Sequence, residues 1–250
     1  MPRILLEVEY VGTAYHGWQR QTPDIVSVQG TLEAALARLV QHPVEVVAAG
    51  RTDRGVHARC QMVHFDTTAR RPVHAFITGT NHFLPPDIRV HAARVVPDTF
   101  HARFSAQARQ YHYHILNQPV ASSILHDRVL WHRLPLDLEK MQEGAQYLVG
   151  THDFSSFRSQ ECQAKSPIKT LHFCEIRRQD HLMIVDVKAN GFLHHMVRNI
   201  VGVLLEIGQK KKEPQWMESV LAAKSRRAAA MTIPPQGLYF VGVDYPSIKI

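Results

Sequence analysis

The sequence predicts an α+β fold with mainly antiparallel sheet, and two observations lead to this prediction. Segments that alternate apolar and polar residues, as half-buried strands do, are mixed along the chain with segments whose apolar residues recur every three or four positions, as in helices. Hairpins are also frequent, for example the two strands expected on either side of Gln179-Asp180. Mixed helices and strands with many hairpins are typical of the α+β class.

Strands and two helices are expected in the first half of the chain. Leu6, Val8 and Tyr10 alternate with two glutamates, which is the pattern of a half-buried strand. Ser27 has the side chain of an N-cap, and it precedes a helix that we expect to continue to about residue 40. The other elements expected here are strands over 44–49, 61–66 and 88–96 and a helix over 72–83.

The second half has a similar mixture of elements. A strand over 108–116 places Tyr111 and Tyr113 on one face, because alternate side chains of a strand share a face. Asp137 can cap the next helix, and the helix expected over 193–207 is the most apolar of the chain. The remaining expected strands are 171–178, 182–188 and 238–244.

Composition permits a sizeable core and favours an anionic partner. The chain has 250 residues, of which 45% are hydrophobic, and this length allows one large domain or two smaller ones. The turn at residues 117–119 is compatible with a domain boundary near residues 105–125. A net charge of +7 favours nucleic acid as a partner, although a soluble protein can simply be basic.

Cysteine usage and hydropathy predict a cytoplasmic protein. The chain has three cysteines, Cys60, Cys162 and Cys174, and no pair has the Cys-x-x-Cys spacing, which fits a reducing compartment. No apolar run approaches the ~20 residues that a membrane-spanning helix needs, so no membrane contact is expected. An acidic residue at Glu7 comes too early for the apolar core of a signal peptide.

The segment 49–58 is the best candidate for a reactive loop. It places one carboxylate, Asp53, among Arg51, Arg54 and two glycines, between two expected strands. Loops held by strands often carry reactive groups, and the neighbouring cations favour the ionised carboxylate. An ionised carboxylate suits a nucleophile or an electrostatic stabiliser better than a general acid. The alternative is an aspartate that caps a turn and forms a surface ion pair.

The apolar helix over 193–207 carries a polar stripe. The members of the stripe are spaced three and four residues apart: His194, His195, Arg198, Asn199 and Gly202. A cation on an otherwise buried helix needs an anionic neighbour, because an unpaired buried guanidinium is costly. Asp53 or an RNA phosphate could supply that charge, and a purely structural salt bridge between domains is the alternative.

Histidine is abundant, so a metal-dependent hydrolase is an alternative from another class. His57, Cys60 and His64 are close in sequence, and His194 and His195 are adjacent. Adjacent residues of a helix point about 100° apart, which does not suit chelation of one ion. The first three lack the motif of a zinc deaminase, and there is no phosphate-binding loop or dinucleotide fingerprint. We therefore expect no metal and no cofactor.

The loop around Asp53 resembles a known motif. Gly50-Arg51-Thr52-Asp53-x-Gly55-Val56-His57-Ala58 is similar to the active-site motif of the tRNA pseudouridine synthase A family. One departure is visible, because Arg54 stands where the family usually has a small residue. Further blocks resemble the family in the family's order, at residues 10–21, 27–36, 81–90, 100–113, 150–157, 192–202 and 235–246.

The resemblance implies a fold, a partner and a reaction. The fold would consist of two similar α/β halves, 1–105 and 106–250, whose mainly antiparallel sheets meet at a central active-site cleft. The chain would be an isomerase, working as a homodimer that converts uridine to pseudouridine at positions 38, 39 and 40 in the anticodon stem-loop of tRNA. No small-molecule cofactor is implied. A non-catalytic RNA-binding protein on the same fold is the alternative, and the carboxylate at Asp53 argues against it.

The resemblance also implies roles for individual residues. Asp53 would assist cleavage of the glycosidic bond, either as a nucleophile or as the acceptor of a ribose proton. Arg198 would pair with Asp53, and Tyr111 would stack on the target base. The residues expected to bind the substrate, besides Tyr111, all belong to the loop: Arg51, which would steady the extruded nucleotide, and Thr52, Arg54 and His57.

Overall fold

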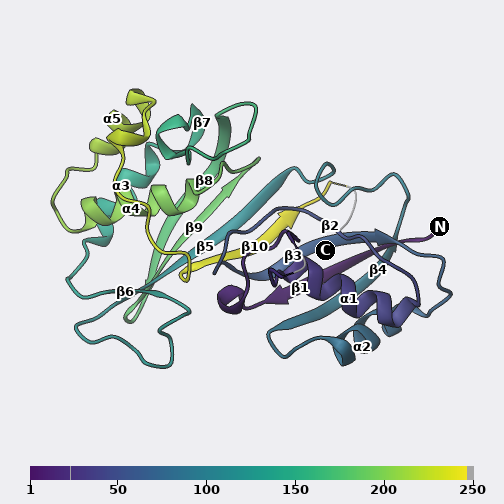
Figure 1. Cartoon of the computed structure of the whole chain (residues 1–250). Helices are drawn as coiled ribbons and strands as arrows, with labels where there is room; N and C mark the ends of the chain where they lie inside the picture. Colours follow the sequence, from purple (N-terminus) through teal and green to yellow (C-terminus); the bar gives the residue numbers. More distant parts are fainter. Residues whose placement is uncertain (23, 247–250) are drawn as a thin grey trace. The chain divides into compact units, whose positions relative to one another are not determined.

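The computed structural model describes residues 1–22 and 24–246. They form two compact units: the first comprises Met1–Gln107 with the segment that begins at Tyr239, and the second is Ala108–Leu238 (Figure 1). Each unit combines helices with mostly antiparallel strands, which confirms the predicted α+β class. The domain boundary expected between residues 105 and 106 and the cleft expected between the halves stay predictions.

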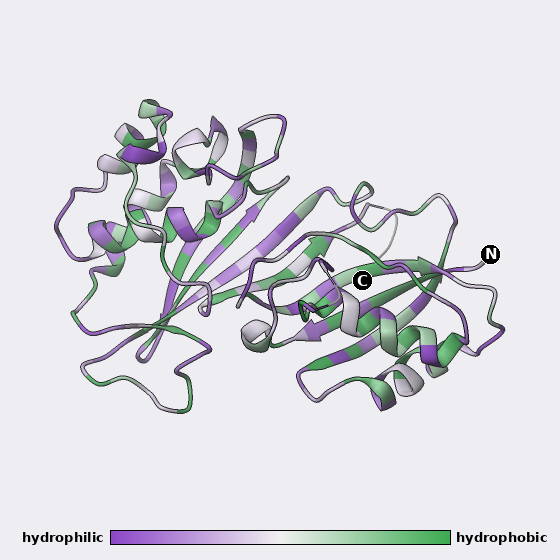
Figure 2. Cartoon of the chain, viewed as in Figure 1, coloured by the Kyte–Doolittle hydropathy of each residue, from purple (hydrophilic) through white to green (hydrophobic). Residues whose placement is uncertain are grey.

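The sheet of the first unit is built around β1 (Arg3–Tyr10), whose neighbours β3 (His57–Asp66) and β4 (Ile88–Val96) both pair antiparallel with it. The other edge of β3 pairs in parallel with β10 (Leu238–Asp244) near its start and antiparallel with β2 (Val47–Ala48) near its end. The strand predicted from alternation in the first ten residues is therefore confirmed. Figure 2 shows hydrophobic and hydrophilic residues alternating along several of the strands.

Two helices, α1 (Val28–Val40) and α2 (Val73–Phe83), belong to the first unit, with a short 3₁₀ turn, η1, at Gly12–Ala14. Ser27 caps α1 as predicted, since its hydroxyl accepts a hydrogen bond from a backbone N–H of the first turn. The rings of Phe65 on β3 and Phe76 on α2 lie 5.9 Å apart. Because adjacent strand residues point to opposite faces, α2 covers the sheet face of Phe65 and leaves that of His64 to other segments.

The chain between β4 and β5 folds back over the face of His64. His64 is buried, and its Nδ1 accepts a hydrogen bond from the backbone N–H of Ala102 at 3.1 Å. The hydroxyl of Tyr245 donates to the carbonyl of Ala102 at 2.6 Å, and the ring of Phe100 lies 5.0 Å from that of Tyr245. Burial, with the positive charge of Arg3 as a smaller cause, lowers the pKa of His64 to about 4.

We expect His64 to make stability depend on pH. Between the ordinary pKa of 6.5 and about 4, the unfolded chain binds a proton that the folded chain excludes. The contribution of neutral His64 to the free energy of unfolding is complete above pH 6.5 and is lost as the pH falls towards about 4. The variant His64→Asn keeps an acceptor and cannot titrate, so its melting temperature should fall less over this range than that of the wild type. Parallel pH profiles in circular dichroism would contradict this.

The sheet of the second unit is antiparallel in the order β5 (Ala108–Asn117), β9 (Leu182–Ala189), β8 (Ile168–Gln179) and β7 (Gly150–Asp153). A short strand, β6 (Leu130–His132), pairs in parallel with β5. The helices are α3 (Leu138–Gln146), α4 (Met196–Gly208) and α5 (Trp216–Ala223), with 3₁₀ turns η2 (Ser155–Phe157) and η3 (Arg226–Ala228). Asp137 caps α3 as predicted by accepting a hydrogen bond from the backbone N–H of Lys140. No helix within residues 1–22 and 24–246 is long and apolar enough to cross a bilayer.

Several predicted elements differ in extent from the observed ones, and β3, for example, begins at His57, four residues before the strand predicted over 61–66. The strand expected over 44–49 is reduced to β2, because side chains of α1 take the backbone groups of Val46: Glu33 accepts from its N–H at 3.0 Å and Gln29 donates to its carbonyl at 3.2 Å. The helix expected from residue 193 begins at Met196, because His195 has a left-handed backbone with φ of 63°. His194 and His195 therefore precede the helix and do not belong to a helical stripe.

Candidate active site

Asp53 lies in the loop that joins β2 to β3 in the first unit. The backbone N–H of Val56 donates to the carbonyl of Asp53 at 3.1 Å, which closes a tight turn around the carboxylate. Asp53 is half-buried, whereas Arg51 and Arg54 on either side of it are exposed. The loop therefore presents one carboxylate between two cations that are open to a negatively charged ligand.

The wall of this loop is the segment that follows β1. The backbone N–H of Trp18 donates to the carbonyl of Thr52 at 3.0 Å. Gly17 packs so closely that a Cβ atom there would lie 2.8 Å from the same carbonyl, and a Cβ at Gly12 would lie 2.0 Å from the carbonyl of Val56. Real side chains do not approach backbone so closely, so only glycine allows these two segments to meet.

Buried polar groups fix the loop from beneath. The hydroxyls of Tyr10 and Thr52 are hydrogen-bonded at 2.7 Å, and burial raises the pKa of Tyr10 above its ordinary value. The side-chain amide of Gln61 on β3 donates to the carbonyl of Gly50 at 2.8 Å. Because buried hydrogen bonds are costly to leave unmade, these contacts hold the backbone on both sides of Asp53 in one arrangement.

Thr52 and His57, which were expected to bind substrate, contribute to this frame. Thr52 is buried against Tyr10, and the buried ring of His57 lies 4.8 Å from that of Tyr239. The Nδ1 atom of His57 accepts a hydrogen bond from the backbone N–H of Gly12 at 3.0 Å. The contact of Thr52 and His57 with a substrate stays a prediction. Their structural role was not predicted from the sequence, and neither was the support that Tyr10, Gly12 and Gly17 give to the loop. The close spacing of glycines directly after a strand was the available signal.

In the second unit, Tyr111 lies on β5. Its side chain is 8% exposed, and its ring meets the ring of Phe192 edge to face with centroids 4.9 Å apart. Phe192 lies in the segment between β9 and α4. Tyr111 therefore has an aromatic neighbour that holds its ring plane, and its role in base stacking stays a prediction.

Arg198 lies in the first turn of α4, and one of its partners is a backbone carbonyl. Its Nε donates to the carbonyl of Ile233 at 2.8 Å. The next residue, Asn199, is buried and receives a hydrogen bond from the hydroxyl of Thr232 at 2.6 Å. A Cβ at Gly202 would lie 2.5 Å from the carbonyl of Met231. The stripe of Arg198, Asn199 and Gly202 therefore packs against residues 231–233. The pairing of Arg198 with Asp53 stays a prediction.

The two histidines before α4 are closer together than helical spacing allows. The ring centroids of His194 and His195 lie 4.0 Å apart, with an angle of 36° between the planes. The argument that adjacent helical residues diverge does not apply to them. The ring nitrogens Nδ1 of His57 and His64 accept hydrogen bonds from separate backbone N–H groups, those of Gly12 and Ala102. The absence of a metal stays a prediction.

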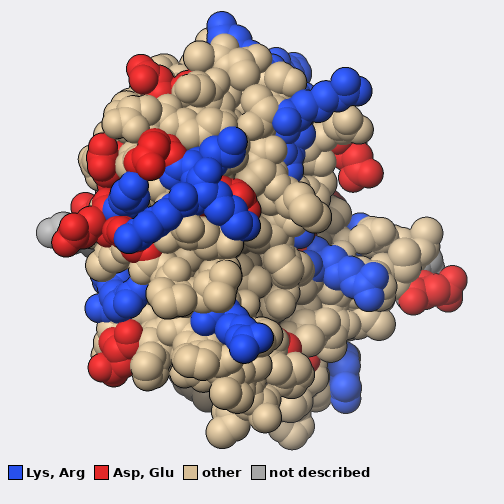
Figure 3. Space-filling model, turned by 90° about the vertical axis from the view of Figure 1, so that its left-hand side faces the viewer, with Lys and Arg blue, Asp and Glu red and all other residues tan. Residues whose placement is uncertain are grey.

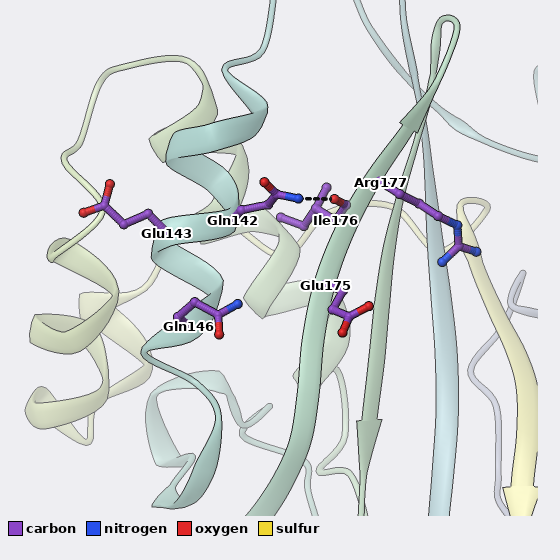
Figure 4. A pocket seen from close by; sticks show the side chains of 6 residues that line it. All are labelled: Gln142, Glu143, Gln146, Glu175, Ile176 and Arg177. Carbon is purple, nitrogen blue, oxygen red and sulfur yellow. Dashed lines mark hydrogen bonds between the residues drawn. The ribbon is translucent and has the colours of Figure 1, made fainter.

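A hollow of about 470 Å³ lies between α3 and β8, away from these residues (Figure 4). Figure 4 shows Ile176 pointing towards α3, with Gln142 donating to the carbonyl of Ile176 at 2.7 Å. Glu175 and Arg177 lie on the opposite face of the strand, and Arg177 reaches Asp186 at 3.1 Å. Two of its six lining residues are acidic, Glu143 and Glu175, and the lining cation Arg177 pairs with Asp186, so the hollow does not suit an anionic ligand.

The chain matches known proteins over most of its length. A model of the tRNA pseudouridine synthase family matches residues 7–105 and 145–246. The chain belongs to this family. The two matched ranges contain Asp53 and Arg198, and Tyr111 lies between them.

Curated relatives of the family extend the match to nearly the whole chain. The chain is 52% identical over 244 residues to tRNA pseudouridine synthase A of Pseudomonas aeruginosa, covering 98% of this chain and 86% of the relative. It is 50% identical over 246 residues to tRNA pseudouridine synthase A of Coxiella burnetii, covering 98% and 94%. A relative of the same name from Colwellia psychrerythraea is 50% identical over 244 residues, covering 98% and 94%. Tyr111 lies within the span that these relatives cover.

Proposed function

We propose that this member of the family isomerises uridine to pseudouridine in tRNA, at positions 38, 39 and 40 of the anticodon stem-loop. The observation that carries the proposal is the loop of Asp53, a half-buried carboxylate held rigidly between two exposed arginines. The glycosidic bond between carbon and nitrogen breaks, the uracil turns while it is held, and the ribose reattaches to carbon 5 of the base. The reaction is neither a redox change nor a net hydrolysis, so it needs no cofactor.

Each proposed residue has a distinct task. Asp53 assists cleavage by attacking the anomeric carbon or by accepting a ribose proton. Arg198 pairs with Asp53 and keeps it ionised, since a nearby cation favours the charged carboxylate. Tyr111 stacks on the target base after the nucleotide is extruded from the stem, at a cost of a few kcal/mol. Arg51 and Arg54, both exposed, contact the RNA around the extruded nucleotide.

The release of tritium tests this function. The protein is incubated with tRNA that carries tritium at carbon 5 of its uridines, because bond formation at carbon 5 must release that tritium to water. We expect release only from uridines 38, 39 and 40, and tRNAs with cytidine at these positions serve as the control. A protein that binds the tRNA but releases no tritium would be the non-catalytic RNA-binding alternative, which no observation favours.

The working unit is proposed to be a homodimer in the cytoplasm, where tRNA is found. On the face drawn in Figure 3, lysine and arginine side chains form several separate groups, with acidic side chains among some of them. A tRNA is longer than one chain of this size, and two-fold assembly is the commonest way to build a longer basic surface. We expect light scattering in moderate salt to give the mass of a dimer. A monomer that is fully active at micromolar concentration would contradict the proposal.

A further inference from the structure

Phe104, in the chain between β4 and β5, is an exposed aromatic side chain with an ordered neighbour. Its side chain is 76% exposed to solvent. Its ring is stacked on the ring of His101, with centroids 4.3 Å apart and only 29° between the planes. An exposed phenylalanine costs hydrophobic free energy, and a side chain without packing partners is free to rotate. Here the ring packs on His101, while most of the side chain stays open to solvent at the surface of the first unit.

The stack rests on a rigid support. The backbone N–H of His101 donates to the hydroxyl of Ser105 at 3.0 Å, and the carbonyl of His101 accepts from the N–H of Ser105 at 2.8 Å. The Nδ1 atom of His101 accepts hydrogen bonds from the backbone N–H groups of Arg103 and Phe104, both at 3.2 Å. Beneath it, the ring of the buried His64 lies 4.9 Å away. Three rings thus lead from the interior to the surface.

The electrostatic surroundings suit an anionic, aromatic ligand. The guanidinium of Arg103, which is exposed, lies 5.6 Å from the centroid of the Phe104 ring. Burial and the positive charges of Arg3 and Arg103 lower the pKa of His101, so its ring is neutral and can accept the two hydrogen bonds from the backbone. Proteins that bind single-stranded nucleic acid combine an aromatic side chain with a nearby cation. A base stacks on the aromatic ring, and the phosphate lies near the cation.

The stack is far from the reactive loop of the same unit. The loop of Asp53 joins β3 at His57, and His64 lies seven residues further along that strand. At about 3.3 Å per residue, this separation is roughly 23 Å along the strand. A base on Phe104 is therefore not the uridine held at Asp53 but a second nucleotide of the same RNA.

We propose that Phe104, supported by His101 and flanked by Arg103, is a stacking platform for an unpaired base of the tRNA, distinct from the target uridine. The inference rests on the proposed function, because it takes tRNA as the ligand. A protein partner is less well matched, because the residues around Phe104 in this turn, His101, Arg103 and Ser105, offer polar groups in place of an apolar patch.

The test compares variants that keep or remove the aromatic face. With labelled tRNA in fluorescence anisotropy, we expect Phe104→Leu to raise Kd about tenfold, or about 1.4 kcal/mol, because stacking on the base is lost. Phe104→Trp should keep the wild-type Kd. The slope of log Kd against log salt should stay unchanged in Phe104→Leu and become smaller in Arg103→Gln, because only the second loses a phosphate contact. Val95→Ala, at a side chain 60% exposed on β4, is the matched control and should bind as the wild type does.

The outcomes separate this inference from the proposed function. If Phe104→Leu binds tRNA within about twofold of the wild type, or if Phe104→Trp loses affinity as Phe104→Leu does, the platform is wrong. Tritium release by the wild type decides the function independently of these variants. Because Phe104 is exposed, its substitutions should leave the melting temperature unchanged. A lower melting temperature in Phe104→Leu would make Phe104 a structural residue and overturn the inference.

Discussion

Asp53→Asn should abolish tritium release while tRNA binding survives. Asp53 is the only carboxylate in its loop, and asparagine can neither attack the anomeric carbon nor accept a ribose proton at a useful rate. Affinity for tRNA comes mainly from contacts with phosphates, which the substitution leaves in place, and the loss of one negative charge can only favour an anionic ligand. The rate of release should fall below about a hundredth of the wild-type rate, near the low end of what one catalytic group contributes.

The matched control for this variant is Asp24→Asn. Asp24 belongs to the same unit and is exposed, so its substitution makes the same change of charge outside the reactive loop. It should release tritium at the wild-type rate. The backbone of the loop should keep its arrangement in Asp53→Asn, because it is held by the hydrogen bonds of Tyr10, Thr52 and Gln61. Release by Asp53→Asn above the stated fraction would rule out the catalytic role.

Arg198→Met should reduce both activity and stability. The variant loses the hydrogen bond to the carbonyl of Ile233, which by itself costs about 1 kcal/mol. If Arg198 also pairs with Asp53, the loss leaves a carboxylate without its cation, a change that typically costs ~3–5 kcal/mol for a buried pair. Activity per folded molecule should then fall much further than stability alone explains, and Arg198→Lys should restore part of it.

Arg226→Met provides the comparison for this loss. Arg226 donates to Asn199 and to Thr232, close to where Arg198 meets Ile233, but has no proposed part in the reaction. Its substitution should lower the melting temperature and leave the activity of the folded protein unchanged. Full activity of Arg198→Met with an unchanged melting temperature would contradict both the proposed pairing and the contact with Ile233.

Local sequence patterns predicted most elements but could not predict what distant side chains do to the backbone. The last strand and β4 have the predicted bounds, and Ser27 and Asp137 cap their helices, because strand alternation and caps depend on neighbouring residues. The strand over 44–49 was predicted from β-branched residues. It is wrong because Glu33 and Gln29, from α1, bind the backbone of Val46 in place of a neighbouring strand.

The support of the candidate site could not be predicted from the sequence. Asp53 is predicted from its place between glycines and arginines, and its role in the reaction stays a prediction. The contacts of the loop with Tyr10, Gly12 and Gly17 join residues about forty positions apart, and no periodicity reports such contacts. The backbone of His195 is a second case, since its positive φ precedes the start of α4 and no pattern of apolar residues indicates it.

Because Gly12 and Gly17 approach the loop of Asp53 closely, the reactive loop cannot be transferred to another protein by itself. If residues 49–58 were grafted onto another scaffold, the carboxylate and both arginines would be present, but the surface against which the backbone of Thr52 and Val56 is shaped would be missing. The smallest piece that could be transplanted is a pair of segments, 10–18 and 49–61, held at a fixed distance by two adjacent strands. Recombination between relatives should therefore preserve the two segments together.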